Sequence, residues 1–302
     1  MSGVNEIWPG WQIIEELGKG QFGHVYKIKK TDDHTGREFF SALKVITIPK
    51  SDDEAQYYLD DGYDLDSITN LYANQVNRIV DEFSLLYRFK GTANIVSYED
   101  HRVLHSEDSL SWQIMIRMEL LTPMTKYLAA HPMSESDVIR CGIDICRALE
   151  LCQTENIIHR DIKPQNIFVN DFGSFKLGDF GIARSMDHTT HATLAGTMTY
   201  LAPEVFRREK YNSSVDMYSL GLVMYWLLNE RRMPFLPLPP ALPTASQSEE
   251  ALARRYHGDA LPPPAHASEE LAAIILKACA FRPEDRFATP AQMRRTCPVE
   301  IR

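Results

Sequence analysis

One stretch decides how this sequence folds: His159-Arg160-Asp161-Ile162-Lys163-Pro164-Gln165-Asn166, followed thirteen residues after Asn166 by Asp179-Phe180-Gly181. It places two acids, a lysine and an asparagine in one short, β-rich segment. Phosphoryl transfer needs this set of groups. A carboxylate orients the attacking hydroxyl and accepts its proton, a cation stabilises the moving group, and an Asn/Asp pair holds metal ions on the phosphates. The stretch therefore predicts a phosphoryl-transfer site.

The two motifs, intact and in this order, resemble the catalytic loop and metal-binding turn of protein kinases. The resemblance implies that Asp161 orients the acceptor hydroxyl, that Lys163 stabilises the transferred group, and that Asn166 and Asp179 hold the metal. It also implies ATP as the phosphoryl donor with Mg²⁺, for which Mn²⁺ is a substitute. Lys163 at its position in the first motif is a mark of the serine/threonine class.

Length and composition limit the kind of protein. A chain of 302 residues can form one large domain or two lobes with an ample core. Its 44% hydrophobic and 24% charged residues are typical of a globular protein. The net charge of −9 argues against nucleic acid as the main partner, because basic groups drive that binding. A nucleotide must therefore be held by local cations and metal.

The cysteines and the N-terminus indicate the compartment. Five cysteines with no CxxC pair support neither a disulfide framework nor a zinc site, and they fit a reducing environment. The N-terminus lacks a basic region followed by an apolar core, so no signal peptide is expected. The longest apolar run, Met217 to Leu228, is too short to span a bilayer. We expect a cytoplasmic chain without a membrane segment.

A glycine cluster near the N-terminus predicts a phosphate-binding hairpin: Leu17-Gly18-Lys19-Gly20-Gln21-Phe22-Gly23-His24-Val25. A GxGxxG pattern alone is weak, and a dinucleotide-binding fold would continue as a helix. Here the sequence after Val25 continues as a strand. Glycines let backbone amides approach phosphate oxygens because no Cβ intervenes. The resemblance assigns nucleotide contacts to Leu17, Gly18, Gly20, Gly23 and Val25.

The resemblance to protein kinases implies an ion pair between a lysine on the following strand and a glutamate on the helix after it. Ser41-Ala42-Leu43-Lys44-Val45-Ile46 reads as a strand, in which Lys44 would grip the α- and β-phosphates and Ala42 would pack on the adenine. Helical periodicity runs from Ile68 to about Phe89. Glu82 on this helix matches the glutamate that pairs with the lysine. The neighbouring Asp81 points about 100° away, so only one of the two acids can face the strand.

An acidic patch separates this strand from this helix. Residues 51–66 hold seven acids and three tyrosines. We interpret the patch as a solvated or partly ordered insertion, and the alternative is a docking surface for a basic partner.

Two more strands lead to an expected hinge. We predict strands at Ile95–Tyr98 and Trp112–Met118, the second ending where a proline follows. By resemblance, the backbone beyond the second strand reads the adenine edge, and side chains matter little there. The resemblance assigns nucleotide-site roles to the gatekeeper Met118, to the backbone of Glu119 and Leu121, and to Phe168.

The C-terminal part reads as helices. Ser134 to Gln153 is amphipathic, with Ser134 as N-cap. The segment Gly196-Thr197-Met198-Thr199-Tyr200-Leu201-Ala202-Pro203-Glu204 resembles the serine/threonine form of the end of a kinase activation segment, where Thr197 would bind the catalytic loop. Two scaffold contacts are also implied: Asp216 with the catalytic-loop backbone, and Arg286 with Glu204.

The resemblance also suggests regulation. Thr193 lies four residues before Thr197, at the spacing where related kinases carry a phosphothreonine. Three cations fall where that phosphate needs partners: Arg160, Arg184 and Arg78.

The resemblance implies an α+β, two-lobed fold, and the motifs look like those of a eukaryotic-like serine/threonine protein kinase catalytic domain of the bacterial type. Residues 1–121 would form the β-rich lobe with one long helix, and residues 122–302 the helical lobe. Proteins bearing Ser or Thr would be substrates, and autophosphorylation would involve a homodimer. A pseudokinase scaffold is disfavoured because Lys44, Asp161, Asn166 and Asp179 are all present. A small-molecule kinase is disfavoured by the peptide platform that the 196–204 segment implies.

Overall fold

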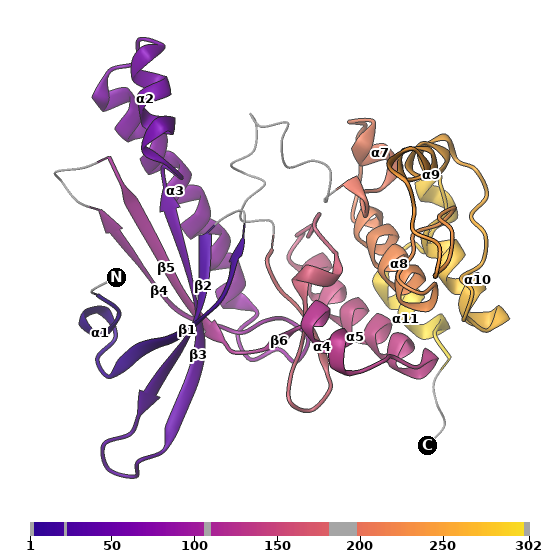
Figure 1. The fold of residues 1–302 in the computed structure, drawn as a ribbon, viewed down its shortest axis with the longest axis horizontal. Coiled ribbons are helices and arrows are strands. Elements are labelled where there is room, and N and C mark those ends of the chain that lie inside the picture. The colour runs from indigo at the N-terminus through magenta and orange to yellow at the C-terminus, as the bar shows by residue number, and fades with distance from the viewer. Residues whose placement is uncertain (1–2, 21–22, 106–109, 181–197, 299–302) are drawn as a thin grey trace. The chain divides into compact units, whose positions relative to one another are not determined.

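The computed structural model describes residues 3–20, 23–105, 110–180 and 198–298, except for the side chains of Asp52, Glu82 and Leu85. The described chain forms two compact units (Figure 1). Unit 1 contains the residues up to Thr92 together with Val96–Leu121. Unit 2 contains Ala93–Ile95 and the described residues from Thr122 onward. The expected α+β architecture of a β-rich part followed by a helical part is confirmed.

Unit 1 is built on a five-stranded sheet in the order β1-β2-β3-β5-β4, with every neighbouring pair antiparallel. β-Branched and aromatic residues dominate the central strands, as expected for strands covered on both faces. The strands are β1 (Trp11–Gly20), β2 (Gly23–Thr31), β3 (Glu38–Ile48), β4 (Tyr98–His105) and β5 (Trp112–Glu119).

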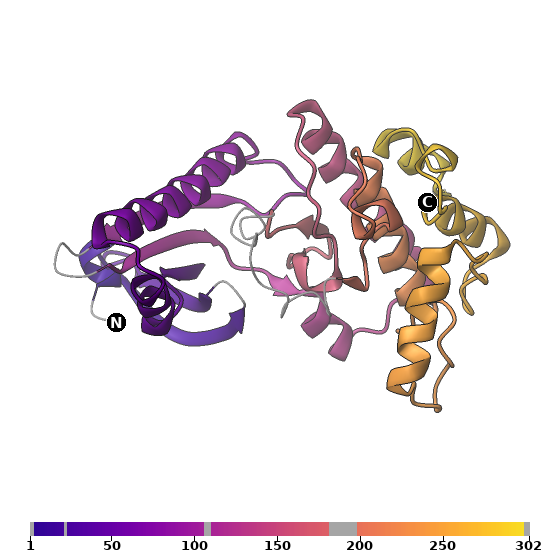
Figure 2. The ribbon, with the colours of Figure 1, turned by 90° about the horizontal axis from the view of Figure 1, so that it is seen from above.

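One face of the sheet is covered by the helix α3 (Leu65–Arg88), which runs along it (Figures 1 and 2). The helix starts three residues before the predicted Ile68, because the Asp64 carboxylate accepts the backbone N–H of Ser67 and caps it. Its apolar stripe recurs every three or four residues and packs on three strands. The stripe consists of Ile68, Tyr72, Val76, Ile79 and Phe83.

The opposite face of the sheet is covered by the N-terminal segment. The short helix α1 (Val4–Ile7) brings Val4 and Trp8 against buried side chains of β1, β2, β3 and β5. The indole N–H of Trp8 donates to Asp100 on β4 at 2.7 Å, which joins the segment to the sheet edge. Apolar burial on both faces fixes the register of β3, since a one-residue slip would exchange its two faces.

The acidic residues 51–66 are more ordered than predicted. They form the helix α2 (Asp52–Asp60), a turn, and the first residues of α3. Tyr58 packs against the apolar cluster beneath α3, and its ring meets those of Tyr63 and Tyr72 edge to face. The interpretation as a solvated insertion is therefore wrong for this aromatic side of the helix, although the acids remain largely exposed.

The strand predicted at Ile95–Tyr98 is displaced. β4 begins at Tyr98, where that prediction ended, and runs to His105. Asn94 and Ile95 instead join unit 2: the Asn94 carbonyl accepts the Leu177 N–H at 2.9 Å, and Ile95 forms a parallel bridge with Leu177. An apolar residue such as Ile95 is expected in a strand of either sheet, so the sequence pattern could not show which of the two sheets it joins.

Unit 2 is a set of helices with one small sheet. The sheet consists of β6 (Thr122–Pro123), β7 (Ile167–Val169) and β8 (Phe175–Leu177). The helices are α4 (Met124–Ala130), α5 (Glu135–Thr154), α7 (Pro203–Phe206), α8 (Ser214–Leu228), α9 (Ala245–His257), α10 (Glu269–Ala278) and α11 (Pro290–Thr296), with 3₁₀ turns at Pro164–Asn166 and Pro283–Asp285.

Helix α8 is the core of unit 2. Thirteen of its 15 residues are buried, and it packs against α5 and α10. Ser134 caps α5 as predicted, in a reciprocal arrangement in which its hydroxyl accepts the N–H of Asp137 while the Asp137 carboxylate accepts the N–H of Ser134. Across the described residues, no helix is both long enough and apolar enough to cross a membrane.

Candidate active site

A buried carboxylate on α8 holds the catalytic loop, residues 159–166. Asp216 accepts the backbone N–H of His159 through Oδ2 and that of Arg160 through Oδ1, each at 2.8 Å. A buried charge is tolerated when hydrogen bonds replace its lost water, and Asp216 is buried. The expected contact between this helix and the loop is confirmed.

His159 links the catalytic loop to the residues before Asp179. It is 1% exposed. Its Nδ1 accepts the backbone N–H of Asp161 at 3.3 Å, and its Nε2–H donates to the carbonyl of Gly178 at 3.1 Å. The ring also contacts Phe180, with centroids 4.7 Å apart. The motif contained this histidine, but no local pattern indicated that it bridges two segments.

Three predicted residues of the loop come together at Asp161. The Lys163 ammonium lies 2.9 Å from Oδ2 of Asp161. The Asn166 amide nitrogen donates to that same oxygen and to the Asp161 carbonyl, both at 2.8 Å. Since the amide nitrogen faces Asp161, the amide oxygen of Asn166 is the atom left to bind a metal.

Two site residues have left-handed backbones. Arg160 has φ 65° and Asp179 has φ 52°. This region is uncommon for residues other than glycine, and it persists where surrounding contacts impose it, often at functional sites. One such contact is the N–H of Gly178, which donates to the carbonyl of Asn166 at 2.9 Å and joins the turn to the loop.

Arg160 is one of the three cations predicted to bind a regulatory phosphate. Its guanidinium lies over the ring of Tyr211, 5.6 Å from the centroid. Such an exposed cation–π contact contributes about 0.5–1 kcal/mol, so a phosphate could displace it.

The register of the sheet in unit 1 collects the predicted nucleotide-binding residues on one face. Lys44 lies opposite Val25 on β2 and opposite Ile116 on β5, and Ala42 lies opposite Met118. Directly paired residues share a face. Ile116 packs with α3, so this is the face that α3 covers. Gly18 also belongs to it, since it pairs with Val25.

Lys44 is 8% exposed, which is unusual for a lysine and fits a role for its charge. Glu82 belongs to α3, but its side chain lies outside the described residues, so the ion pair with Lys44 stays a prediction. Arg78 is exposed on α3, one turn before Glu82.

The glycines of the β1–β2 hairpin serve different needs. A Cβ on Gly23, which has φ 135°, would lie 1.9 Å from the carbonyl oxygen of Val45, so this glycine permits close packing on β3. A Cβ on Gly18 would meet nothing within 4 Å. Leu17 is exposed beside it. The open space around Gly18 suits approach by a ligand, whereas Gly23 is explained by the fold.

At the expected hinge, where β5 ends, the side chain of Glu119 forms a hydrogen bond, although side chains were expected to matter little there. Glu119 donates its N–H to the carbonyl of Ser97 at 3.0 Å, and its carboxylate accepts the N–H of Ser97. The N–H of Glu119 is thus engaged by Ser97. Leu121 ends unit 1 and is partly exposed.

Phe168 is the middle residue of β7, between the buried Ile167 and Val169. Because side chains alternate along a strand, Phe168 faces away from that core and is partly exposed. The remaining predicted residues Gly181, Arg184, Thr193 and Thr197 lie outside the described part of the chain.

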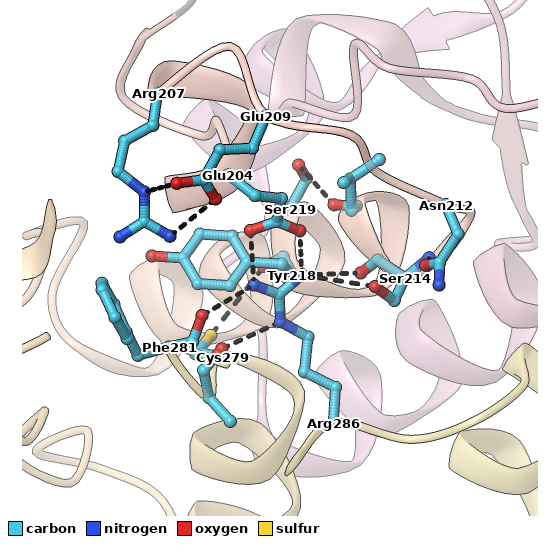
Figure 3. Close-up of polar contacts among 12 residues, drawn as sticks. Glu204, Arg207, Glu209, Asn212, Ser214, Tyr218, Ser219, Cys279, Phe281 and Arg286 are labelled. Atoms are coloured by element: carbon cyan, nitrogen blue, oxygen red, sulfur yellow. Dashed lines mark hydrogen bonds and ion pairs between the residues drawn. The ribbon is translucent and has the colours of Figure 1, made fainter. Parts of the chain in front are cut away.

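A buried ion pair joins Arg286 to Glu204 within unit 2, as Figure 3 shows. Arg286 binds both carboxylate oxygens of Glu204, at 2.6 and 2.8 Å. Its Nε donates to the carbonyl of Ala280, and its guanidinium lies over the ring of Tyr218. The predicted contact between Arg286 and Glu204 is confirmed.

Comparison with known proteins now identifies the family. A family model described as "Protein kinase domain" matches residues 11–296. The chain belongs to the protein kinase family. It is 36% identical over 170 residues to the serine/threonine-protein kinase PknB of Mycobacterium leprae, covering 54% of this chain and 26% of that protein.

Two further relatives extend the comparison. A probable serine/threonine-protein kinase of Corynebacterium efficiens is 34% identical over 175 residues, covering 54% of this chain and 25% of that protein. A cyclin-dependent kinase 4 homolog of Caenorhabditis elegans is 31% identical over 218 residues, covering 70% and 48%. This kinase chain thus spans about a quarter of the length of the bacterial relatives that it matches.

The residues of this kinase fit the ATP and divalent metal that its family implies. Mg²⁺ prefers oxygen ligands and is usually held by one or two carboxylates together with phosphates. The Asn166 amide oxygen and the Asp179 carboxylate supply such donors. Among the described residues, no group of three or more His, Cys, Asp or Glu could hold a metal ion.

Proposed function

We propose that this chain is an ATP-dependent serine/threonine protein kinase, which transfers the γ-phosphoryl group to Ser or Thr hydroxyls of proteins. The observation that carries the proposal is the cluster of Asp161, Lys163 and Asn166 on a loop anchored by buried Asp216. The serine/threonine class is supported by Lys163 at its motif position and by the printed names of the bacterial relatives.

Each residue of the cluster has a distinct role. Asp161 accepts a hydrogen bond from the acceptor hydroxyl and aims its oxygen at the phosphorus. Lys163, held 2.9 Å from Asp161, places its positive charge where the transferred group gains negative charge. Asn166 and Asp179 would hold Mg²⁺, whose positive charge would neutralise phosphate charge. Positioning and charge supply most of the catalysis.

Unit 1 supplies the nucleotide contacts in this proposal. Lys44 binds the α- and β-phosphates, and Ala42 and Met118 border the adenine. Their shared face on the sheet supports this assignment. Residues 1–121 would then serve ATP binding, and residues 122–302 would serve catalysis and substrate recognition.

The test is phosphoryl transfer from radiolabelled ATP to a generic basic protein, followed by hydrolysis to phosphoamino acids. We expect phosphoserine or phosphothreonine, and almost none with Asp161→Asn. Asp171→Asn is the matched control, because Asp171 is an exposed aspartate on the β7–β8 turn of the same unit. Wild-type protein that binds ATP but transfers no phosphate would indicate a binding scaffold instead.

We also propose autophosphorylation at Thr193 between two copies of the chain, with Arg78, Arg160 and Arg184 as phosphate ligands. A phosphate carries nearly two negative charges and three acceptor oxygens, so it can bind several arginines at once. Thr193→Ala and Arg78→Ala should each lower activity, and the double variant should be little worse than either, because both remove one interaction. Losses that simply add, or an unmodified Thr193 in fully active enzyme, would contradict this mechanism.

A further inference from the structure

The three residues before Leu201 have their carbonyl groups held by side chains from other helices. The Met198 carbonyl accepts from Arg255 Nη2 at 3.1 Å and from the Tyr256 hydroxyl at 2.7 Å. The Thr199 carbonyl accepts from Arg255 Nη1 at 2.5 Å. The Tyr200 carbonyl accepts from the Ser219 hydroxyl at 2.8 Å. Residues 198–200 also form a turn, in which the Leu201 N–H donates to the Met198 carbonyl at 3.3 Å. Tertiary contacts hold all three carbonyls of this segment in addition to that turn.

Arg255 is the central donor of this arrangement. It is 4% exposed, and its planar guanidinium binds two successive carbonyls through two different nitrogens, a fixed fork geometry that the single ammonium nitrogen of a lysine does not have. The guanidinium also lies over the ring of Tyr256, which stacks on Phe206 at 4.0 Å. Within the described part of the chain, Arg255 pairs with no carboxylate, and its guanidinium donates to backbone carbonyls instead. Since a buried arginine without a carboxylate partner is costly, this arrangement points to a positional role.

The segment lies beside the catalytic loop. Asp216 and Ser219 are one turn apart on α8, so they lie on the same side of that helix. Asp216 holds the backbone of His159 and Arg160, while Ser219 holds the carbonyl of Tyr200. One buried helix therefore sets the distance from the segment to the loop that carries Asp161. An acceptor substrate that reaches Asp161 must lie close to residues 198–200.

We propose that Arg255 is a positioning residue for the acceptor substrate. Arg255 holds the backbone of residues 198–200 in place, and this backbone forms the surface that binds the substrate residues next to the acceptor Ser or Thr. The inference rests on the protein kinase activity proposed above. Helix α9 is joined to the rest of unit 2 through the buried residues Ala251, Arg255 and Tyr256, so the acceptor side depends on α9 although α9 carries none of the catalytic groups.

The test compares Arg255→Met and Arg255→Lys with the control Arg254→Met. Arg254 is the neighbour on α9, but it is exposed, pairs with Asp259 and stacks on Phe235, away from the segment. Each variant is assayed on an array of peptides with a central Ser or Thr and varied flanking residues. The peptide KM, the flanking selectivity and the Kd for a fluorescent ATP analogue are measured.

For Arg255→Met we expect the peptide KM to rise about tenfold or more and the flanking selectivity to flatten, with the nucleotide Kd within about twofold of wild type. Arg255→Lys should fall between wild type and Arg255→Met, and Arg254→Met should match wild type. An unchanged peptide KM and selectivity in Arg255→Met would overturn the proposal. So would an equal loss of nucleotide and peptide binding, which indicates general damage.

Two further measurements decide the remaining cases. If Arg255→Met does not fold, Tyr256→Phe removes a single hydroxyl from the Met198 carbonyl and should alter the same flanking preference. The positioning role would be refuted if the flanking preference of Tyr256→Phe or of Arg255→Lys were the same as that of wild type. If wild-type protein transfers no phosphate, the kinase proposal fails. Amide hydrogen exchange at residues 198–201 then still shows whether Arg255→Lys loosens the segment. An exchange rate in Arg255→Lys equal to that in the control Arg254→Met would refute the positioning role.

Discussion

Replacing Arg286 with methionine tests how much unit 2 depends on one buried ion pair. The substitution keeps an unbranched side chain but leaves the Glu204 carboxylate, 2% exposed, without its two guanidinium donors. It also frees the carbonyls of Ala280 and Phe281. Removing one partner of a buried pair costs about 3–5 kcal/mol. A domain is typically stable by only about 5–15 kcal/mol, so the loss is a large share of the total.

The assay is urea unfolding followed by far-UV circular dichroism, which reports mainly the helical unit. The control is Arg294→Met, because Arg294 also binds both carboxylate oxygens of a glutamate, Glu150, but with 29% of its side chain exposed. We expect the control to lose about 1 kcal/mol or less. The double variant Arg286→Met with Glu204→Met should be more stable than Arg286→Met alone, since it removes the uncompensated charge. A loss in Arg286→Met no larger than in the control, or a double variant that is the least stable of all, would refute this reasoning.

Three further outcomes are expected. Asp161→Asn should leave ATP affinity nearly unchanged while transfer falls by orders of magnitude, whereas Asp179→Asn should also weaken binding of the metal–nucleotide complex; equal ATP affinity in both variants would contradict this division of roles. Burial pushes the pKa of Asp100 up, but hydrogen bonds from Trp8 and the His101 backbone, together with the charges of Arg102 and Arg117, hold that pKa below its ordinary value. The ionised Asp100 carboxylate therefore stabilises the fold fully at neutral pH, and this stabilisation disappears as the pH falls from about 4 toward the pKa of Asp100 in the folded protein. The difference in unfolding free energy between wild type and Asp100→Asn should shrink in that range and should be constant above about pH 6. The hydroxyl of the fully buried Tyr72 has no hydrogen-bond partner among the described residues, so Tyr72→Phe should raise the free energy of urea unfolding by up to about 1 kcal/mol, and a clear decrease would show that the hydroxyl is bound.

The fold and much of the site could be predicted from the sequence because the decisive contacts are short in sequence or follow a strict period. Asp161, Lys163 and Asn166 lie within six residues, so the loop alone can bring them together. Alternation along β3 places Ala42 and Lys44 on one face, and the stripe on α3 covers that face. The contacts of Asp216 and Arg286 were anticipated because complete motifs carried them, not because their spacing implied contact.

The features that sequence reasoning missed depend on which elements meet. The many acidic residues of α2 suggested a solvated segment, but this segment forms a helix that is ordered by the packing of Tyr58 onto α3. Ile95 is apolar in either sheet, and only its bridge to Leu177 assigns it to unit 2.

Arg254 and Arg255 show the difference most directly. They are identical neighbours in the sequence, yet one is exposed and the other is buried against two carbonyls. The sequence alone predicted helices in the C-terminal part, because helix formation depends on nearby residues, but it did not single out α9. Only the tertiary structure decided which arginine faces inward, because burial depends on the angle at which α9 packs and on backbone more than fifty residues away.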